Sequence, residues 1–315
     1  MSVETRKPIV VIAGPTGSGK SALALALAER FRGAIVNADS QQVYRELFVL
    51  TQRPSPRDEA RAPHFLYGVL PAAERCSAGR WLCLALQAIA EIRGEGRLPL
   101  VVGGTGLYLK ALMEGIAEVP PIPPKTVAAA RDLRGRIGNA AFRAELARLD
   151  PEGAARIAEK DSQRLVRAYA VRRATGVCLS EWHRRERSRA RARPDRFLVL
   201  ALDPPRDQLD RRLDLRFDAM MAEGALAEAR ALDRLGLDPT LPAVKAVGVR
   251  ELLEHLAGRA TLEEAVAKAK RATRQFAKRQ RTWLRNQVAG ARTFGSFGET
   301  AIDEASRAVA AFLAV

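Results

Sequence analysis

Residues 14–21 read Gly-Pro-Thr-Gly-Ser-Gly-Lys-Ser and directly follow the apolar run of residues 8–13. This spacing fits the pattern GxxxxGK[ST], in which glycines let the backbone curl and turn its N–H groups toward phosphate oxygens. Lys20 supplies a positive charge, the helix that follows adds the positive end of its dipole, and the Ser21 hydroxyl is suited to ligate Mg²⁺. The motif predicts phosphate binding, with Mg²⁺ as cofactor, by Gly14, Pro15, Thr16, Gly17, Ser18, Gly19, Lys20 and Ser21. It does not by itself predict hydrolysis.

Two more polar residues follow apolar runs. Asp39 follows the run at 34–38, within Asn-Ala-Asp-Ser-Gln-Gln-Val-Tyr, and Thr105 follows the run at 98–102, within Gly-Gly-Thr-Gly-Leu-Tyr. Because the carboxyl ends of parallel strands converge on a ligand site, both are expected near the phosphate loop. Asp39 could hold Mg²⁺, act as a base or cap the next helix. The glycines around Thr105 could equally be a plain tight turn.

The order of the elements predicts an α/β fold, a P-loop parallel-sheet core with an inserted small all-helical domain. The apolar runs at 8–13, 34–38, 98–102 and 197–202 predict buried strands, and residues 21–31 and 80–93 predict helices. A proline cluster at 119–124 and an arginine-rich stretch at 184–195 bound a region of short, charged helical segments. We therefore predict a discontinuous catalytic core of residues 1–116 and 196–315 and a helical basic insertion domain of residues 117–195.

The positive charge of the chain is clustered. The formal net charge is +16, and residues 120–196 hold 19 Lys and Arg against 9 Asp and Glu. Residues 270–285 hold 7 Lys and Arg and no acidic residue, within a long helix predicted from a capping box at Thr261 to about residue 286. Clustering of this kind predicts a nucleic-acid partner. The run from Arg184 to Arg193 could be a flexible basic arm.

Other features exclude several classes of protein. The three cysteines lack CxxC spacing, so neither a disulfide framework nor a zinc site is expected. No stretch approaches the length of a membrane-spanning helix, and no apolar segment precedes the first predicted strand. A cytoplasmic protein with no membrane partner is expected. No exposed heptad seam is visible, so we expect a monomer.

Five segments in this order resemble the tRNA dimethylallyltransferase (IPP transferase) family: GPTGSGKS, NADSQQVYR, VVGGTGLYLKALMEG, DSQRLVRAYAVRRATG and ATRQFAKRQRTWLRNQ. The resemblance extends from about residue 8 to residue 287. It implies transfer of a dimethylallyl group from dimethylallyl diphosphate to N6 of the adenosine adjacent to the tRNA anticodon, position 37. It also implies that the loop binds the donor's diphosphate, that Asp39 is the general base and that Thr105 lies beside the reacting centre. Arg216 is our candidate for a further diphosphate contact, with Arg211 and Arg212 within a turn of it.

The resemblance also implies contacts with the anticodon stem-loop of tRNA. These would come from Asp39, Ser40, Gln41, Gln42, Thr105, Gln163, Arg164, Leu165, Val166, Arg167, Lys245, Ala246, Val247, Gly248, Val249, Arg250, Lys278, Arg279, Gln280, Arg281, Thr282, Trp283, Leu284 and Arg285. The residues themselves leave alternatives open. Gln163, Arg164 and Arg167 could merely form a solvated helix face. Phe276 and Trp283, seven residues apart on one helix face, could pack in the core or stack on bases.

Three competing classes share some of these features. A P-loop small-molecule kinase would have the same loop and sheet, but it has no need of a basic insertion. An isopentenyltransferase acting on free adenine nucleotides would not require the clustered charge. A nucleic-acid-binding NTPase would be expected to have an acidic residue at a strand end, whereas the run at 100–104 ends in two glycines.

Overall fold

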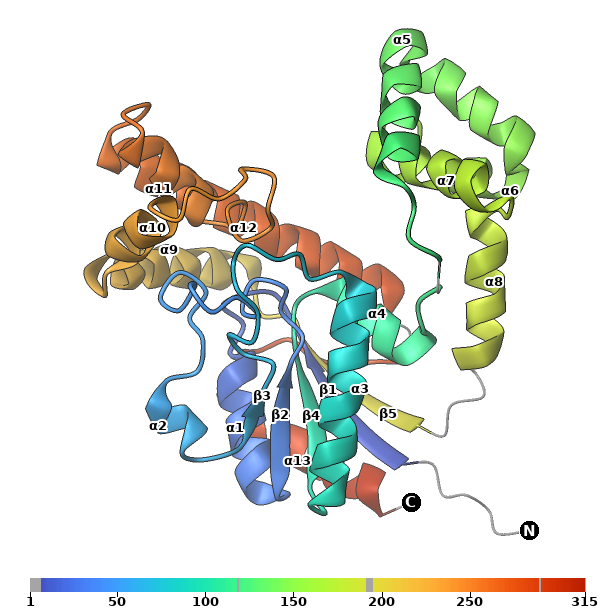
Figure 1. The fold of residues 1–315 in the computed structure, drawn as a ribbon. Coiled ribbons are helices and arrows are strands. Elements are labelled where there is room, and N and C mark those ends of the chain that lie inside the picture. The colour runs from blue at the N-terminus through green and yellow to red at the C-terminus, as the bar shows by residue number, and fades with distance from the viewer. Residues whose placement is uncertain (1–6, 118, 191–194, 289, 315) are drawn as a thin grey trace, which may run out of the picture. The chain divides into compact units, whose positions relative to one another are not determined.

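The computed structural model describes residues 7–117, 119–190, 195–288 and 290–314 (Figure 1). The chain divides into two compact units, which are described separately. Unit 1 comprises residues 1–111 and 194–315, and unit 2 comprises residues 112–193. Residues 191–193 of the predicted basic arm lie outside the described residues.

Unit 1 is built on a six-stranded, all-parallel sheet in the order β3-β2-β4-β1-β5-β6. The strands are β1 (Lys7–Ala13), β2 (Gly33–Asn37), β3 (His64–Phe65), β4 (Leu98–Gly103), β5 (Asp195–Leu202) and β6 (Arg292–Phe294). The four longer strands match the four apolar runs of the sequence. The α/β fold class with a P-loop core is therefore confirmed.

Helices cover both faces of this sheet (Figure 1). Val10 and Ile12 of β1 point to one face, where they join an apolar cluster with α1 (Lys20–Arg30) and α13 (Ile302–Leu313). On the opposite face, α3 (Ala78–Gly94) packs on β2 and β4 and buries Trp81 completely. Because both faces are covered, the strands can be apolar at consecutive positions.

Apart from the short helix that precedes the edge strand β3, the remaining helices of unit 1 stand around the carboxyl ends of the strands (Figure 1). That short helix is α2 (Pro56–Glu59), and the others are α4 (Gly106–Glu114, which ends just beyond the unit boundary), α9 (Arg206–Ala222), α10 (Ala225–Asp233), α11 (Val249–Leu256) and α12 (Leu262–Gln287). Thr261 caps α12 in a capping box with Glu264, as the sequence predicts. The short strands β3 and β6 are not predicted, because two or three residues are too few to show a periodic pattern.

Unit 2 consists of α5 (Pro124–Leu149), α6 (Pro151–Arg156), α7 (Ser162–Thr175) and α8 (Leu179–Ala190). Gly138, at φ 79°, kinks α5 in its middle. Phe142, Leu146 and Leu165 are fully buried in a core formed by α5, α6 and α7. The unit therefore has a hydrophobic centre of its own.

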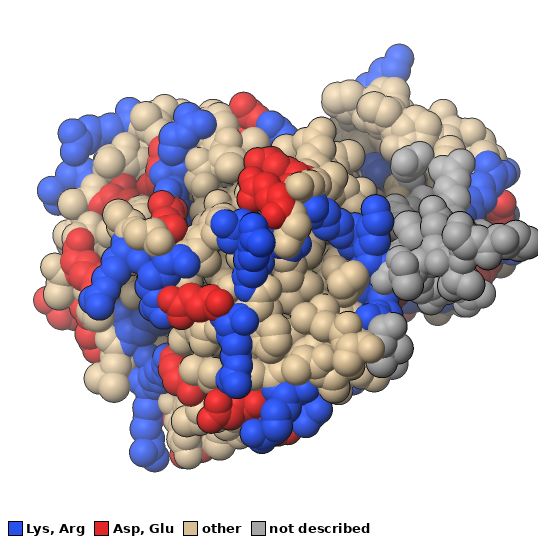
Figure 2. Space-filling model, turned by 90° about the horizontal axis from the view of Figure 1, so that it is seen from below, with Lys and Arg blue, Asp and Glu red and all other residues tan. Residues whose placement is uncertain are grey.

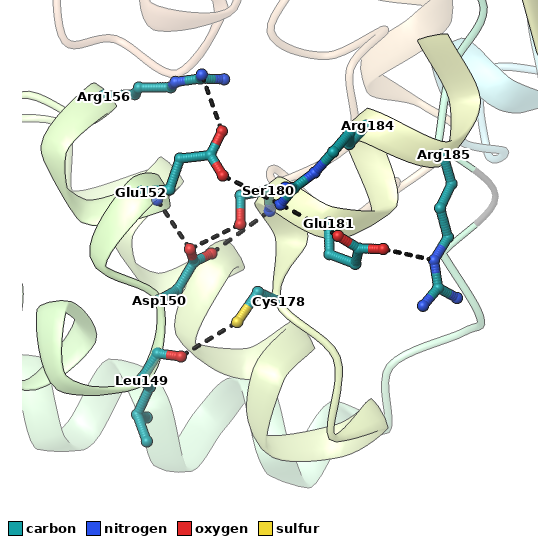
Figure 3. Close-up of polar contacts among 10 residues, drawn as sticks. Leu149, Asp150, Glu152, Arg156, Cys178, Ser180, Glu181, Arg184 and Arg185 are labelled. Atoms are coloured by element: carbon teal, nitrogen blue, oxygen red, sulfur yellow. Dashed lines mark hydrogen bonds and ion pairs between the residues drawn. The ribbon is translucent and has the colours of Figure 1, made fainter. Parts of the chain in front are cut away.

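A buried carboxylate joins three of these helices (Figure 3). Asp150 is only 1% exposed and caps α6 by accepting the N–H of Gly153 at 2.8 Å. Its other partner is Ser180 of α8, whose hydroxyl donates to it at 2.7 Å. The thiol of Cys178 lies 3.1 Å from the carbonyl oxygen of Leu149. The start of α8 is thus tied to the junction between α5 and α6.

In the part of the chain that the structure describes, no helix combines the length and apolar character needed to cross a bilayer. Figure 2 views the molecule from below, and there basic and acidic side chains are interspersed over unit 1. That face is therefore not the uniformly basic surface that the net charge alone would suggest.

Candidate active site

The phosphate loop occupies the turn between β1 and α1. Gly17 (φ 77°) and Gly19 (φ 85°) adopt left-handed conformations that other residues rarely accept. Gly19 also lies so close to the turn before α13 that a Cβ would come within 2.4 Å of Glu299. The Lys20 ammonium folds back and donates to the carbonyl oxygen of Pro15 at 2.7 Å. The loop therefore has the curled backbone that the motif predicts.

Two cations converge on this loop. Arg216 of α9 donates to the Thr16 hydroxyl at 3.3 Å. Burial lowers the pKa of Lys20 to about 8, although Asp39 partly opposes the shift and Arg216 adds to it. Burial likewise lowers the pKa of Arg216 to about 10, with Asp39 again opposing and Arg212 adding. Two half-buried positive charges beside the N–H groups of this loop favour an anionic ligand.

Asp39 is held in a fixed turn just after β2. The amide of the fully buried Asn37 accepts the Asp39 N–H at 2.8 Å and donates to the Asp39 carbonyl at 3.0 Å. The same Asn37 nitrogen donates to the carbonyl of Leu66 at 3.0 Å. The Asp39 carboxylate then accepts the N–H of Gln41 at 2.9 Å. Asp39 is thus half-buried, and hydrogen bonds hold its backbone in one conformation beside the phosphate loop.

Thr105 lies in the turn between β4 and α4 and is bonded to the Asp39 turn. Its hydroxyl accepts the N–H of Ser40 at 2.9 Å and lies 3.2 Å from the Ser40 hydroxyl. Its own N–H donates to the carbonyl of Ala38 at 3.2 Å. Gly103 must be glycine here, because a Cβ would come within 2.1 Å of the Ala38 oxygen. Asp39 and Thr105, which the sequence predicts at the ends of two strands, therefore lie in adjacent, hydrogen-bonded turns.

An open cleft of about 700 Å³ lies over these groups, and Lys20, Ser21, Asp39 and Arg216 line it. A smaller pocket of about 40 Å³ shares Thr16, Asp39, Thr51 and Arg216 with this cleft. The other walls of the smaller pocket are mainly apolar and come from Leu50, Leu213, Phe217, Met220, Val247 and Phe276. A cleft lined by charged side chains, suited to an anion, thus adjoins an apolar pocket suited to a hydrocarbon group.

The three candidate arginines of α9 differ in their surroundings. Arg216 points at the loop, as described above. Arg212 lines the cleft but is paired with Glu299, 2.5 Å away. Arg211 is exposed and lies 3.8 Å from Asp207 on its own helix. Arg216 is therefore the arginine best placed for an anion.

The residues predicted to contact RNA divide into exposed and buried sets. In α7, Gln163, Arg164 and Arg167 are exposed, whereas Leu165 and Val166 are buried. In the segment 245–250, Lys245 and Arg250 are exposed, Val247 is half-buried, and Ala246, Gly248 and Val249 are buried. In α12, Lys278, Arg279, Thr282 and Arg285 are exposed, Arg281 and Trp283 are half-buried, and Gln280 and Leu284 are buried. Ser40, Gln41 and Gln42 are half-buried beside Asp39.

Several cations of α12 have acidic partners within unit 1. Lys270 pairs with Asp218 at 2.7 Å and Arg274 pairs with Asp214, both on α9. Arg281 and Arg285 both pair with Asp203, at 2.6 and 2.7 Å. These four side chains help to fix α12 in place. Lys278 and Arg279 remain exposed on the same helix, with Arg279 stacked over Phe276.

Two residues of the site are missing from the sequence prediction. Asn37 has a signal that could have found it, since it stands two residues before Asp39 at the end of an apolar run. Glu299 has none, because an acidic residue in a loop 83 positions beyond Arg216 shows no pattern. The parallel sheet and the loop between β1 and α1 define the chain as a P-loop protein.

Comparison with known proteins narrows this class. The family profile described as IPP transferase matches residues 42–287, and one described as isopentenyl transferase matches residues 7–62. The tRNA dimethylallyltransferase of Rhodospirillum centenum is 53% identical over 291 residues, covering 91% of each chain. That of Parvibaculum lavamentivorans is 54% identical over 284 residues, covering 89% of this chain and 88% of its own. The chain belongs to the IPP transferase family.

Solved structures show the same relationship. The full-length tRNA isopentenylpyrophosphate transferase of Bacillus halodurans is 31% identical with a TM-score of 0.71, covering 97% of this chain and 96% of its own. A eukaryotic dimethylallyltransferase acting on tRNA is 27% identical with a TM-score of 0.80, covering 96% of this chain and 78% of its own. The two solved structures thus match the fold over 96–97% of this chain.

Proposed function

We propose that this protein transfers a dimethylallyl group from dimethylallyl diphosphate to N6 of adenosine 37, next to the anticodon of tRNA. The observation that carries the proposal is the convergence of a phosphate loop, Arg216 and the Asp39 carboxylate on one cleft. The similarity to tRNA dimethylallyltransferases supports tRNA as the acceptor and a dimethylallyl group as the group transferred. An apolar pocket beside the two cations supports a donor whose diphosphate carries a short hydrocarbon rather than a nucleoside.

The donor's diphosphate is the leaving group of this reaction. Backbone N–H groups of the phosphate loop that have no partner within the loop or on Gln280, together with the Lys20 ammonium and the Arg216 guanidinium, neutralise the charge that develops on it. We place the dimethylallyl group at the apolar pocket lined by Leu213, Phe217 and Met220. Holding both ends of the donor fixes the direction from which the allylic carbon can be attacked.

The acceptor is a weak nucleophile, the exocyclic amine of an adenine. As the new C–N bond forms, the C–O bond to diphosphate breaks, and one amine proton passes to the Asp39 carboxylate, which acts as general base. Thr105, bonded to Ser40 beside Asp39, supports this turn next to the reacting centre. The adenine must be unstacked from its loop to reach the cleft, as is usual for enzymes that act on a base.

Mg²⁺ is suited to the diphosphate half of the site. The Ser21 hydroxyl, in the first turn of α1 and lining the cleft, would hold it together with diphosphate oxygens. Among the described residues, no cluster of three His, Cys, Asp or Glu side chains could hold a metal alone, which fits a cation that arrives with the donor. When bound, it would further neutralise the leaving group.

Exposed cations supply the RNA contacts in this proposal. Gln163, Arg164 and Arg167 present one helical face of unit 2, and Lys278 and Arg279 present one of α12. Their buried neighbours hold these helices in place.

We place the protein in the cytoplasm, where tRNA is available. We also propose that it is a monomer, which light scattering after gel filtration would test.

The test is a transfer assay on unmodified tRNA with dimethylallyl diphosphate, ATP or neither. After nuclease digestion, mass spectrometry should detect one adenosine heavier by a dimethylallyl group, only with the prenyl donor. Hydrolysis of ATP stimulated by RNA, without a modified nucleoside, would favour an NTPase instead. Phosphorylation of a small molecule would favour a kinase.

A further inference from the structure

One buried amide of α12 faces the phosphate loop. Gln280 is 5% exposed, and its side-chain oxygen accepts the backbone N–H of Thr16 at 2.8 Å, across 264 residues of sequence. Its side-chain nitrogen has no hydrogen-bond partner within the described part of the chain. Because the Thr16 N–H can only donate, the oxygen end of the amide must face the loop. The Gln280 side chain is therefore hydrogen-bonded to the backbone of the phosphate loop.

The same helix lies tightly against the turn that carries Thr105. A Cβ at Gly104 would come within 2.1 Å of the Gln280 nitrogen, and one at Gly106 within 2.1 Å of the Trp283 ring. Glycine at these two positions lets α12 approach the backbone so closely. The Gln280 side chain thus lies between the phosphate loop and the turn from β4 to α4.

The bond from Gln280 continues toward the anion site. The N–H of Thr16 donates to Gln280, and the hydroxyl oxygen of the same Thr16 accepts a hydrogen bond from Arg216 at 3.3 Å. A shift of the Thr16 backbone would move this hydroxyl and so remove the fixed partner of the Arg216 guanidinium. Gln280 thereby acts on the anion site through Thr16, without being close enough to solvent to bind RNA itself.

We propose that Gln280 is a positioning residue, which fixes Thr16 and Arg216 for the diphosphate and sets the phosphate loop against the Thr105 turn. It is then not an RNA contact, although it lies on the helix whose exposed side carries Lys278 and Arg279. The assignment rests on the proposed function for the identity of the donor, but its test needs only diphosphate.

The experiment compares three variants of the full chain with the wild type. Gln280→Met keeps the volume and removes the amide, and Gln280→Asn keeps the amide but shortens its reach. Gln275→Met makes the first change at an exposed position of the same helix and serves as the matched control. Calorimetry measures the Kd of inorganic diphosphate with Mg²⁺, and fluorescence anisotropy measures the Kd of an unmodified anticodon stem-loop.

Loss of one buried hydrogen bond should weaken diphosphate binding about threefold to tenfold in both Gln280 variants, with the RNA Kd unchanged. A double variant with Thr16→Val should lose less than the two single effects combined, because Gln280 acts through Thr16. Weakened RNA binding with normal diphosphate binding would overturn the assignment. So would unchanged diphosphate binding, or an equal loss of both ligands together with a lower Tm, which would indicate packing alone.

The experiments distinguish a failure of the proposed transferase function from a failure of the role proposed for Gln280. A wild-type chain that binds diphosphate but does not modify tRNA would refute the proposed function and still allow Gln280 to be judged. If Gln280→Met does not fold, Gln280→Asn provides the comparison, because it leaves a smaller side chain in the same space. In active protein, the KM of dimethylallyl diphosphate should rise in both variants more than kcat falls.

Discussion

The Asn37 side chain holds the backbone of Asp39 on both sides of its Cα: the amide oxygen of Asn37 accepts the Asp39 N–H, and the amide nitrogen donates to the Asp39 carbonyl. Asn37 is itself immobilised, since Trp81 donates to its carbonyl at 2.8 Å and its nitrogen also reaches Leu66. The carboxylate that we assign as base therefore has a backbone fixed by an amide inside the sheet.

Asn37→Ala should lower the single-turnover rate of transfer about ten- to hundredfold, because small displacements of a catalytic group are costly. Binding of diphosphate and of the anticodon stem-loop should change little, since Asn37 is fully buried. Quenched-flow measurement on the preformed complex gives the rate. Asn139→Ala, which removes a hydrogen-bonded asparagine from unit 2, is the control and should leave that rate unaltered. Equal rates for both variants would contradict the role of Asn37.

Asp39→Asn should lower turnover by about 10²–10⁴, the range expected when a general base is lost. The amide oxygen of asparagine can still accept the Gln41 N–H, so the turn should survive. RNA affinity, measured by anisotropy, should stay close to that of the wild type. Loss of RNA affinity with a normal rate on bound RNA would mean that Asp39 reads the substrate instead of taking its proton.

The sequence predicts the long elements and the chemistry at their ends better than it predicts long-range contacts. The runs that form β1, β2, β4 and β5 and the capping box of α12 are local patterns, and the structure confirms them. The pairing of Arg281 and Arg285 with Asp203 is not local, so the sequence shows seven cations on one helix without showing which are already paired. The burial of Gln280 escapes prediction for the same reason.

Donor binding should weaken above about pH 8. The pKa of Lys20 is lowered to about 8 by burial, so its ammonium loses its proton as the pH rises through that value. Below pH 8 the charge is present, so Lys20 should add no pH dependence to the Kd of inorganic diphosphate. Above it, each bound diphosphate must recover a proton for Lys20, and the Kd should rise up to tenfold per pH unit. The neighbouring cation Arg216 keeps its charge until about pH 10, the value to which burial lowers its pKa.

Calorimetry between pH 7 and 9.5 measures this dependence. Lys20→Arg is the matched control, because arginine keeps its charge over the whole range. Its diphosphate affinity should show a flatter pH profile above pH 8, whatever its absolute value. The same slope in both proteins would assign the titration to the ligand and not to Lys20.

Neutralising Arg164 and Arg167 together should weaken binding of the anticodon stem-loop and flatten its salt dependence. For every phosphate that is no longer neutralised, the slope of log K against log salt should fall by about 0.7–0.9. Anisotropy titrations between about 50 and 200 mM KCl, a range over which such effects are large, give that slope. The control is Arg148→Gln with Arg156→Gln, two exposed arginines of unit 2 that pair with Glu145 and Glu152. An unaltered slope in the first variant would remove that face of α7 from the interface.

Asp150→Ala should destabilise unit 2 by about 1–3 kcal/mol, because the Ser180 hydroxyl and the Gly153 N–H would lose a buried partner. Asp161→Ala removes the corresponding cap of α7 at a more exposed position and should cost about 0.5–1 kcal/mol. Urea unfolding followed by circular dichroism measures both. Diphosphate binding should be unaffected, since the phosphate loop belongs to unit 1. If Asp150→Ala costs no more than Asp161→Ala, the buried carboxylate is not what ties α8 to the start of α6.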